Sequence, residues 1–150
     1  MDNKLTKLKR YLAETVTYFL SRVEGVDRDR YTADRDIRYI LDKAINDIIL
    51  CMVDIAEECL KGHDRSVPET YRQTLLACYE FVGDAATKVA PLAKHRNEMI
   101  HQYLHVNWQN IVTVKTRIPD ILEFADKVHE SRERKEKTVG TISDVENTFE

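Results

Sequence analysis

Residues 34–62 read DRDIRYILDKAINDIILCMVDIAEECLKG, the longest amphipathic stretch of the chain. Asp34 is a suitable N-cap and Gly62 a suitable end for a helix of about 28 residues, or about 42 Å at 1.5 Å per residue. Apolar side chains recur at steps of three and four at Ile37, Leu41, Ala44, Ile48, Met52, Ile55 and Cys59. The stripe is widened by Ile40, Ile45, Ile49 and Ala56. The pattern predicts a central helix that packs against neighbours over more than half of its circumference.

The preceding segment predicts a second long helix, over roughly residues 3–26. Its apolar seam consists of Leu5, Leu8, Leu12, Val16, Phe19, Val23 and Val26. A short charged connection at residues 27–32 joins it to the central helix. The two long helices are therefore expected to pack side by side.

The segments after the central helix predict shorter helices. Pro68 suits the first turn of a third helix, and Gly83 suits its end. Asp84 can cap the helical turns that follow. Pro91 favours the restart of a helix over a kink, because strong periodicity lies after it.

The last helix is expected from about Asn107 to about Glu130. Its inward positions are Ile111, Val114, Ile118, Ile121, Leu122, Ala125 and Val128, and Pro119 is expected to bend it. Beyond Glu130 the apolar rhythm fails and a mixed charge run begins. Residues 131–150 are therefore interpreted as a charged tail, either a helix extension or loosely ordered.

Composition agrees with a helical protein. The 150 residues include only 4 glycines and 3 prolines, and 33% of the residues are charged. No strand pattern, internal repeat or glycine-rich phosphate loop is visible in the sequence. The fold class predicted is all-α, an antiparallel up-and-down bundle of four to five helices, with one domain at residues 1–130.

Charge and hydropathy restrict the function. The formal net charge of −3 argues against a protein that coats nucleic acid through bulk electrostatics, but a local positive cleft stays open. No apolar run approaches the roughly 18 to 20 residues of a membrane span, and no apolar signal core follows Met1. We expect no membrane association and a cytoplasmic location. Cys51, Cys59 and Cys78 lie at apolar helical positions without a Cys-x-x-Cys spacing, which predicts buried free thiols.

The stretch Arg96-Asn97-Glu98-Met99-Ile100-His101-Gln102-Tyr103 departs from an ordinary amphipathic helix. At about 100° per residue, Arg96 falls in the middle of an apolar stripe that includes Val89, Leu92 and Tyr103. A guanidinium cannot enter a packed core unpaired. Asn97 and His101 share the neighbouring polar flank. A fixed cation, an amide and a titratable imidazole along two helical turns indicate a site.

Arg96 and His101 suit metal-free cleavage of RNA. A histidine, with an ordinary pKa near 6.5, can move a proton from the ribose 2′-hydroxyl, which then attacks the neighbouring phosphate. An arginine can neutralise the charge that builds on that phosphate. A two-fold dimer with two such helices face to face would complete the cleft. The alternative is an arginine and a histidine on a solvated or interface surface with no chemistry.

Two other kinds of site can be read in the sequence. Glu98-x-x-His101 and Asp126-x-x-His129 have the spacing of bundle di-metal ligands, but the first two helices offer no inward carboxylates, so no metal is expected. Aromatic side chains at Tyr71, Tyr79, Tyr103 and Trp108 could stack on bases. Core packing is the preferred interpretation for Tyr71 and Tyr79, whereas the other two could border a cleft.

The motif residues carry a family resemblance. Arg96, the polar Asn97, His101 and Tyr103 on the penultimate helix of a small bundle resemble the signature of HEPN domains, and more narrowly of the HepT-like toxins of prokaryotic toxin–antitoxin pairs. The resemblance runs from about residue 8 to 130. It includes the Asp34-Arg35-Asp36-Ile37 opening of the central helix and Tyr71-Arg72 on the third.

This resemblance implies the toxin of a type VII-like toxin–antitoxin system. Such a toxin is a homodimeric, metal-independent endoribonuclease without a cofactor, and Arg96 and His101 of both subunits line its cleft, supported by Asn97. The implied partner is a cognate minimal nucleotidyltransferase antitoxin that transfers AMP to Tyr103. The added bulk and negative charge would exclude an RNA phosphate.

The chain departs from the family pattern in two places, which are the start of the motif helix, with Pro91 and the basic pair Lys94 and His95, and the tail beyond Glu130. Some HEPN domains are not nucleases. The alternative function is therefore a non-catalytic HEPN module that docks a nucleotidyltransferase or a nucleotide.

Overall fold

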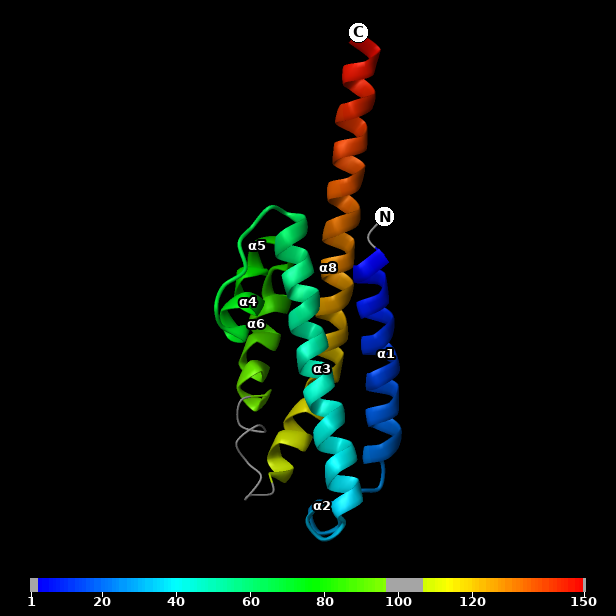
Figure 1. The fold of residues 1–150 in the computed structure, drawn as a ribbon, viewed down its shortest axis with the longest axis vertical. Coiled ribbons are helices and arrows are strands. Elements are labelled where there is room, and N and C mark those ends of the chain that lie inside the picture. The colour runs from blue at the N-terminus through cyan, green and yellow to red at the C-terminus, as the bar shows by residue number, and fades with distance from the viewer. Residues whose placement is uncertain (1–2, 97–106, 150) are drawn as a thin grey trace.

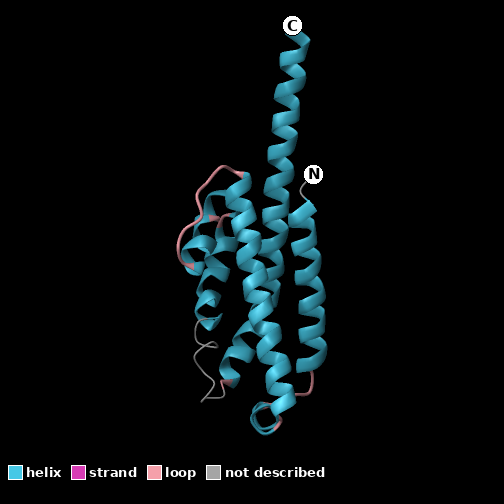
Figure 2. Cartoon of the chain, in the orientation of Figure 1, coloured by secondary structure: helices cyan, strands magenta, loops and turns pink. Residues whose placement is uncertain are grey.

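Three long helices form the frame of the protein. The computed structural model describes residues 3–96 and 107–149. Helices α1 (Asn3–Val23), α3 (Arg35–Gly62) and α8 (Trp108–Phe149) run alongside one another, and a group of short helices covers a further side of α3 (Figure 1). Within the described ranges every regular element is helical (Figure 2). The predicted all-α bundle is confirmed.

Helix α3 is the centre of the bundle, as its sequence predicts. The Asp34 carboxylate accepts a hydrogen bond from the Ile37 backbone N–H at 3.1 Å, and the helix ends at Gly62. Every residue of the predicted apolar stripe is buried, and Ile45, Ile49 and Ala56 from its widened part are buried as well. The helix contacts α1, α2, α4 and α8. Its burial on several sides fixes the positions of its neighbours.

The connection between α1 and α3 contains a helix that the sequence does not predict. Helix α2 spans Arg28–Ala33, and the Asp27 carboxylate caps it by accepting from the Arg30 N–H at 2.8 Å. The connection at residues 27–32 is short and charged, as expected, but most of it is helical. A helix this short gives no apolar periodicity, and only its buried Tyr31 faces the core.

The short-helix layer is more segmented than its sequence predicts. It contains α4 (Tyr71–Ala77), α5 (Tyr79–Val82), α6 (Asp84–Val89) and the single 3₁₀ turn η1 (Ala90–Leu92). The Thr70 hydroxyl caps α4, so Pro68 precedes the helix instead of occupying its first turn. Gly83 ends α5 at a φ of 64°, a backbone conformation that favours glycine.

Pro91 marks the predicted restart. It lies inside η1, and residues 93–96 are helical again. A proline fits there because the first turn of a helix needs no intrahelical bond from its nitrogen. The segment that carries Arg96 therefore begins as a new turn, packed through the buried residues Leu92 and Ala93.

Helix α8 is longer than its predicted extent of about 107–130. Residues 131–149 continue it, which is one of the two conformations expected for the tail. Pro119 lies inside the helix, and the first turns are inclined to the remainder (Figure 1). Phe124 is fully buried, whereas the predicted Leu122 is only partly buried.

Two further expectations concern the thiols and the membrane. The predicted thiols are confirmed, since Cys51, Cys59 and Cys78 are buried and free. In the described ranges no helix is long and apolar enough to cross a membrane.

The charged part of α8 closes the C-terminal end of α3. Arg132 Nη1 donates to the Glu58 carbonyl at 3.0 Å, and Lys135 Nζ donates to the Gly62 carbonyl. These carbonyls belong to the last turns of α3, where cations are favoured. Partial burial, followed by the charges of Lys135 and Arg132, lowers the pKa of His63, the C-cap of α3. The tail thus packs against the bundle up to at least residue 135.

Gly62 leaves room for the Arg132 guanidinium. A Cβ at this position would overlap Nη1 and Cζ of Arg132. We predict that Gly62→Ala destabilises the protein by about 1 kcal/mol, because the displaced guanidinium loses its bond to Glu58. In an Arg132→Ala background the same substitution should stabilise by up to about 1 kcal/mol through helix propensity. Urea unfolding of the four variants measures both effects, and an equal effect in the two backgrounds would contradict the contact.

Candidate active site

Of the two predicted catalytic residues, Arg96 is the one that the structure describes. It occupies the helical turn 93–96 and is half-buried. Its Nε is buried and has no hydrogen-bond partner among the described residues. A buried donor without an acceptor costs roughly 1 to 3 kcal/mol. The Nε donor of this guanidinium is therefore not used by the described part of the chain.

The other predicted site residues, Asn97, His101 and Tyr103, lie outside the described residues. Their proximity to Arg96 stays a prediction. The structure does describe the two chain segments that flank residues 97–106. These segments show where the chain enters and leaves residues 97–106, which are called the motif region below.

The first flank is held by a buried polar pair that the sequence motifs do not reveal. His95 Nδ1 lies 2.7 Å from Asn110 Oδ1, and the two side chains are 5% and 3% exposed. Because an amide oxygen only accepts, the ring carries its proton on Nδ1 and donates it. The bond joins the residue next to Arg96 to the first turn of α8. It therefore fixes the position of the residue before Arg96 relative to α8, although the two bonded residues are fifteen positions apart in the sequence.

Asn110 carries the one sequence signal for this pair. It lies on the inward side of the last predicted helix, beside Ile111 and Val114, where an apolar residue is expected. The same criterion singles out Arg96. His95 stands in the sequence as part of a basic pair with Lys94, and nothing in its local pattern marks it as buried.

The second flank is held by aromatic packing at the start of α8. The rings of Trp108 and Tyr31 lie 5.3 Å apart at 50°, and the Tyr31 hydroxyl donates to Asp42 at 2.5 Å. Burial raises the pKa of Asp42, against the opposing effects of the Tyr31 bond and the Arg38 charge. Asn107 caps the helix by accepting from the Asn110 N–H at 3.3 Å. Both ends of the motif region are therefore anchored to the bundle.

The structure also describes several of the residues considered for base stacking and for metal binding. Tyr71 and Tyr79 are 37% and 55% exposed, so the interpretation of these two as core residues is wrong. Asp126 forms an ion pair with Lys9 at 2.9 Å, and His129 Nε2 lies 3.1 Å from the Glu133 carboxylate, so the two side chains that have the ligand spacing turn to different partners. In the described part of the chain no group of three or more histidine, cysteine or acidic side chains is arranged to hold a metal. Glu98 and His101 fall outside that part.

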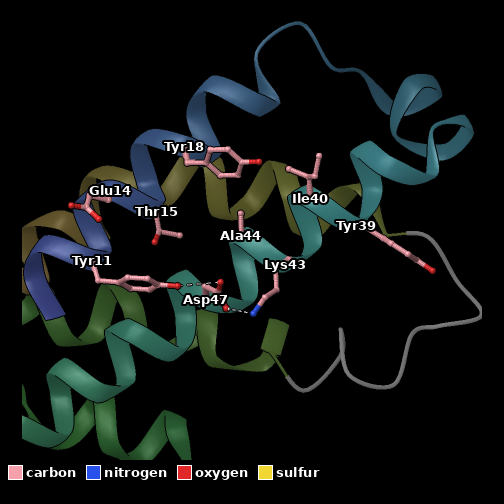
Figure 3. A pocket seen from close by; sticks show the side chains of 9 residues that line it. All are labelled: Tyr11, Glu14, Thr15, Tyr18, Tyr39, Ile40, Lys43, Ala44 and Asp47. Atoms are coloured by element: carbon pink, nitrogen blue, oxygen red, sulfur yellow. Dashed lines mark hydrogen bonds and ion pairs between the residues drawn. The ribbon is translucent and has the colours of Figure 1, made fainter. Parts of the chain in front are cut away.

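A separate hollow of about 520 Å³ lies between α1 and α3 (Figure 3). Tyr11, Tyr18 and Tyr39 border it, and all three are exposed. Asp47 accepts hydrogen bonds there from Tyr11 at 3.3 Å and from Lys43 at 2.8 Å. None of its lining residues belongs to the predicted site.

The chain matches a known protein family. The family model described as ribonuclease HepT-like matches residues 1–128. The matched region contains the whole motif and both of its flanks. A search of curated proteins found no match to the chain.

The His95–Asn110 pair yields a test of how the first flank is held. Asn110→Leu should cost about 1 to 3 kcal/mol of unfolding free energy, because it leaves the buried Nδ1–H of His95 without this acceptor. Adding His95→Leu should restore part of that loss, since both polar groups are then absent. Chemical denaturation of the single and double variants measures the coupling. Strict additivity would show that the pair does not act as a unit.

Proposed function

Because the chain belongs to the ribonuclease HepT-like family, we propose that it is a metal-independent endoribonuclease toxin that cleaves RNA with Arg96 and His101. The observation that carries the proposal is the half-buried Arg96, whose Nε has no partner in the described part of the chain. A guanidinium with an unused donor is stabilised when it binds a phosphate. The family match covers the motif and supports the same assignment.

In the proposed reaction His101 acts as the general base. It removes the proton of a ribose 2′-hydroxyl, and the 2′-oxygen forms a bond to the adjacent phosphorus. The bond from phosphorus to the 5′-oxygen breaks, and that oxygen takes a proton from a general acid. The products are a 2′,3′-cyclic phosphate and a 5′-hydroxyl, and no metal or cofactor is consumed.

Arg96 stabilises the charge that develops on the phosphate. A guanidinium donates two parallel hydrogen bonds to phosphate oxygens, and partial burial strengthens this interaction. The family resemblance suggests a homodimer with the two motif regions facing each other. In that arrangement His101 of the partner subunit supplies the general acid, so one cleft uses both copies of the pair.

We further propose that AMP transfer to Tyr103 silences the site. A minimal nucleotidyltransferase antitoxin would join the Tyr103 hydroxyl to the α-phosphorus of ATP, and pyrophosphate would leave. The adenylyl group brings a negative charge and the volume of a nucleotide into the motif region. Both oppose the entry of an RNA phosphate next to Arg96.

The first test is cleavage of RNA in EDTA. Purified wild-type protein should cut single-stranded RNA, and Arg96→Ala and His101→Ala should each lower the rate at least about a hundredfold. His129→Ala and Arg10→Ala are matched controls, because His129 pairs with Glu133 on α8 and Arg10 is exposed on α1. Full activity in both motif variants would refute the assignment. An inert wild type that still binds a nucleotidyltransferase through Arg96 would favour the non-catalytic module.

The second test is the intact mass of the protein after co-expression with its candidate antitoxin. We expect a gain of one or more AMP units, mapped to Tyr103 by peptide sequencing, together with loss of RNA cleavage. Tyr103→Phe should keep its unmodified mass and its activity. Modification confined to an exposed tyrosine such as Tyr39 would contradict the proposed control point.

A further inference from the structure

A polar groove lies along the segment that ends in Arg96. It has a volume of about 420 Å³, within the range of ligand pockets. One wall is formed by the stretch from Lys88 to His95 and the other by the first turns of α8. The residues that line it are Lys88, Pro91, Leu92, Lys94, His95, Asn107, Gln109, Asn110, Thr113 and Arg117. No site residue predicted from the sequence is among them.

The groove is positively charged although the chain is acidic overall. Lys88, Lys94 and Arg117 line it, and no carboxylate of the described residues does. The nearest acidic partners are outside the lining, Glu123 at 3.6 Å from Lys88 and Asp120 at 3.1 Å from Arg117. Lys94 is exposed. The local excess of cations makes the groove suitable for an anionic ligand.

The N-terminus of α8 adds to this field. The helix is 42 residues long, and its first turn at Asn107 and Gln109 faces the groove. The helix dipole favours negative charge at such an end, although Asn107 already accepts from the Asn110 N–H there. Lys88 and Lys94 on one wall, and Arg117 and the helix end on the other, therefore favour an anion.

Asn110 supplies an independent sign of a ligand. The side chain is 3% exposed and its Oδ1 is occupied by His95, but its Nδ2 has no acceptor among the described residues. Asn110 is among the residues that line the groove. A buried donor in this position is unfavourable until an acceptor arrives, and a phosphate oxygen or a base carbonyl is such an acceptor.

We propose that this groove binds a nucleotide of the RNA substrate next to the scissile phosphate. The inference rests on the proposed ribonuclease function and assigns the part of the protein that holds the strand. Lys94 and Arg117 contact the phosphate backbone, while Gln109, Thr113 and Asn110 offer hydrogen bonds to the ribose and base edges. The groove is too small for a duplex, so the substrate is a single strand.

Binding and cleavage are measured separately to test this. In a His101→Ala background, a labelled single-stranded oligoribonucleotide is titrated at several salt concentrations. Lys94→Glu should weaken its binding about three- to tenfold and lower the slope of log affinity against log salt by about 0.7 for each phosphate that the variant no longer neutralises. Asn110→Asp keeps an oxygen for His95 and replaces the unused donor with an acceptor, so it should also weaken binding.

Lys127→Glu is the matched control, because Lys127 is an exposed lysine of α8, the helix that forms one wall of the groove, and lies outside the groove. Unchanged binding by Lys94→Glu, or an equal loss in Lys127→Glu, would overturn the groove. If Asn110→Asp does not fold, Lys94→Glu alone decides. If Lys94→Glu cleaves RNA as fast as the wild type, the proposed binding groove is rejected and the proposed ribonuclease function stands. If the wild type does not cleave RNA but Lys94→Glu still weakens binding, the ribonuclease function is rejected and the binding groove stands.

Discussion

The burial of α3 is the constraint on which the rest of the structure depends. A helix that is apolar over more than half of its circumference is stable in water only if several neighbours cover it. Helices α1 and α8 and the short-helix layer do so, and each has one apolar face for this purpose. The end of α3 imposes a second requirement, because its last carbonyls need donors. Arg132 and Lys135 meet it and thereby tie the charged part of α8 to the bundle.

A well-packed bundle of this kind allows a few polar groups to be placed at low exposure. The bond from His95 to the Asn110 Oδ1, between the short-helix layer and α8, offsets part of the cost of burying these two side chains. Arg96 follows directly and leaves its Nε without a partner in the described residues. The Trp108–Tyr31 contact holds the other end of the motif region. Packing thus positions Arg96, the described member of the proposed catalytic pair, and both ends of the segment that follows it.

Charge is distributed unevenly over the protein. The whole chain is mildly acidic, which suits a small protein that must not bind nucleic acid everywhere. Three cations, Lys88, Lys94 and Arg117, nevertheless line the groove beside the start of α8. A strand held there would present one phosphate to the motif region. Adenylylation of a residue in that region would compete with the strand for both space and charge.

Sequence alone determined the long helices, because their signals are local. The cap at Asp34 and the periodic stripes of α1, α3 and α8 depend only on residues within a few turns of one another. The resemblance that led to the family rested on a similar local pattern, from Arg96 to Tyr103. Tertiary structure decided what depends on distant partners. Nothing near His95 predicts that it meets Asn110, and the groove beside Arg96 joins two segments that are separate in the sequence, so only the packed chain forms it.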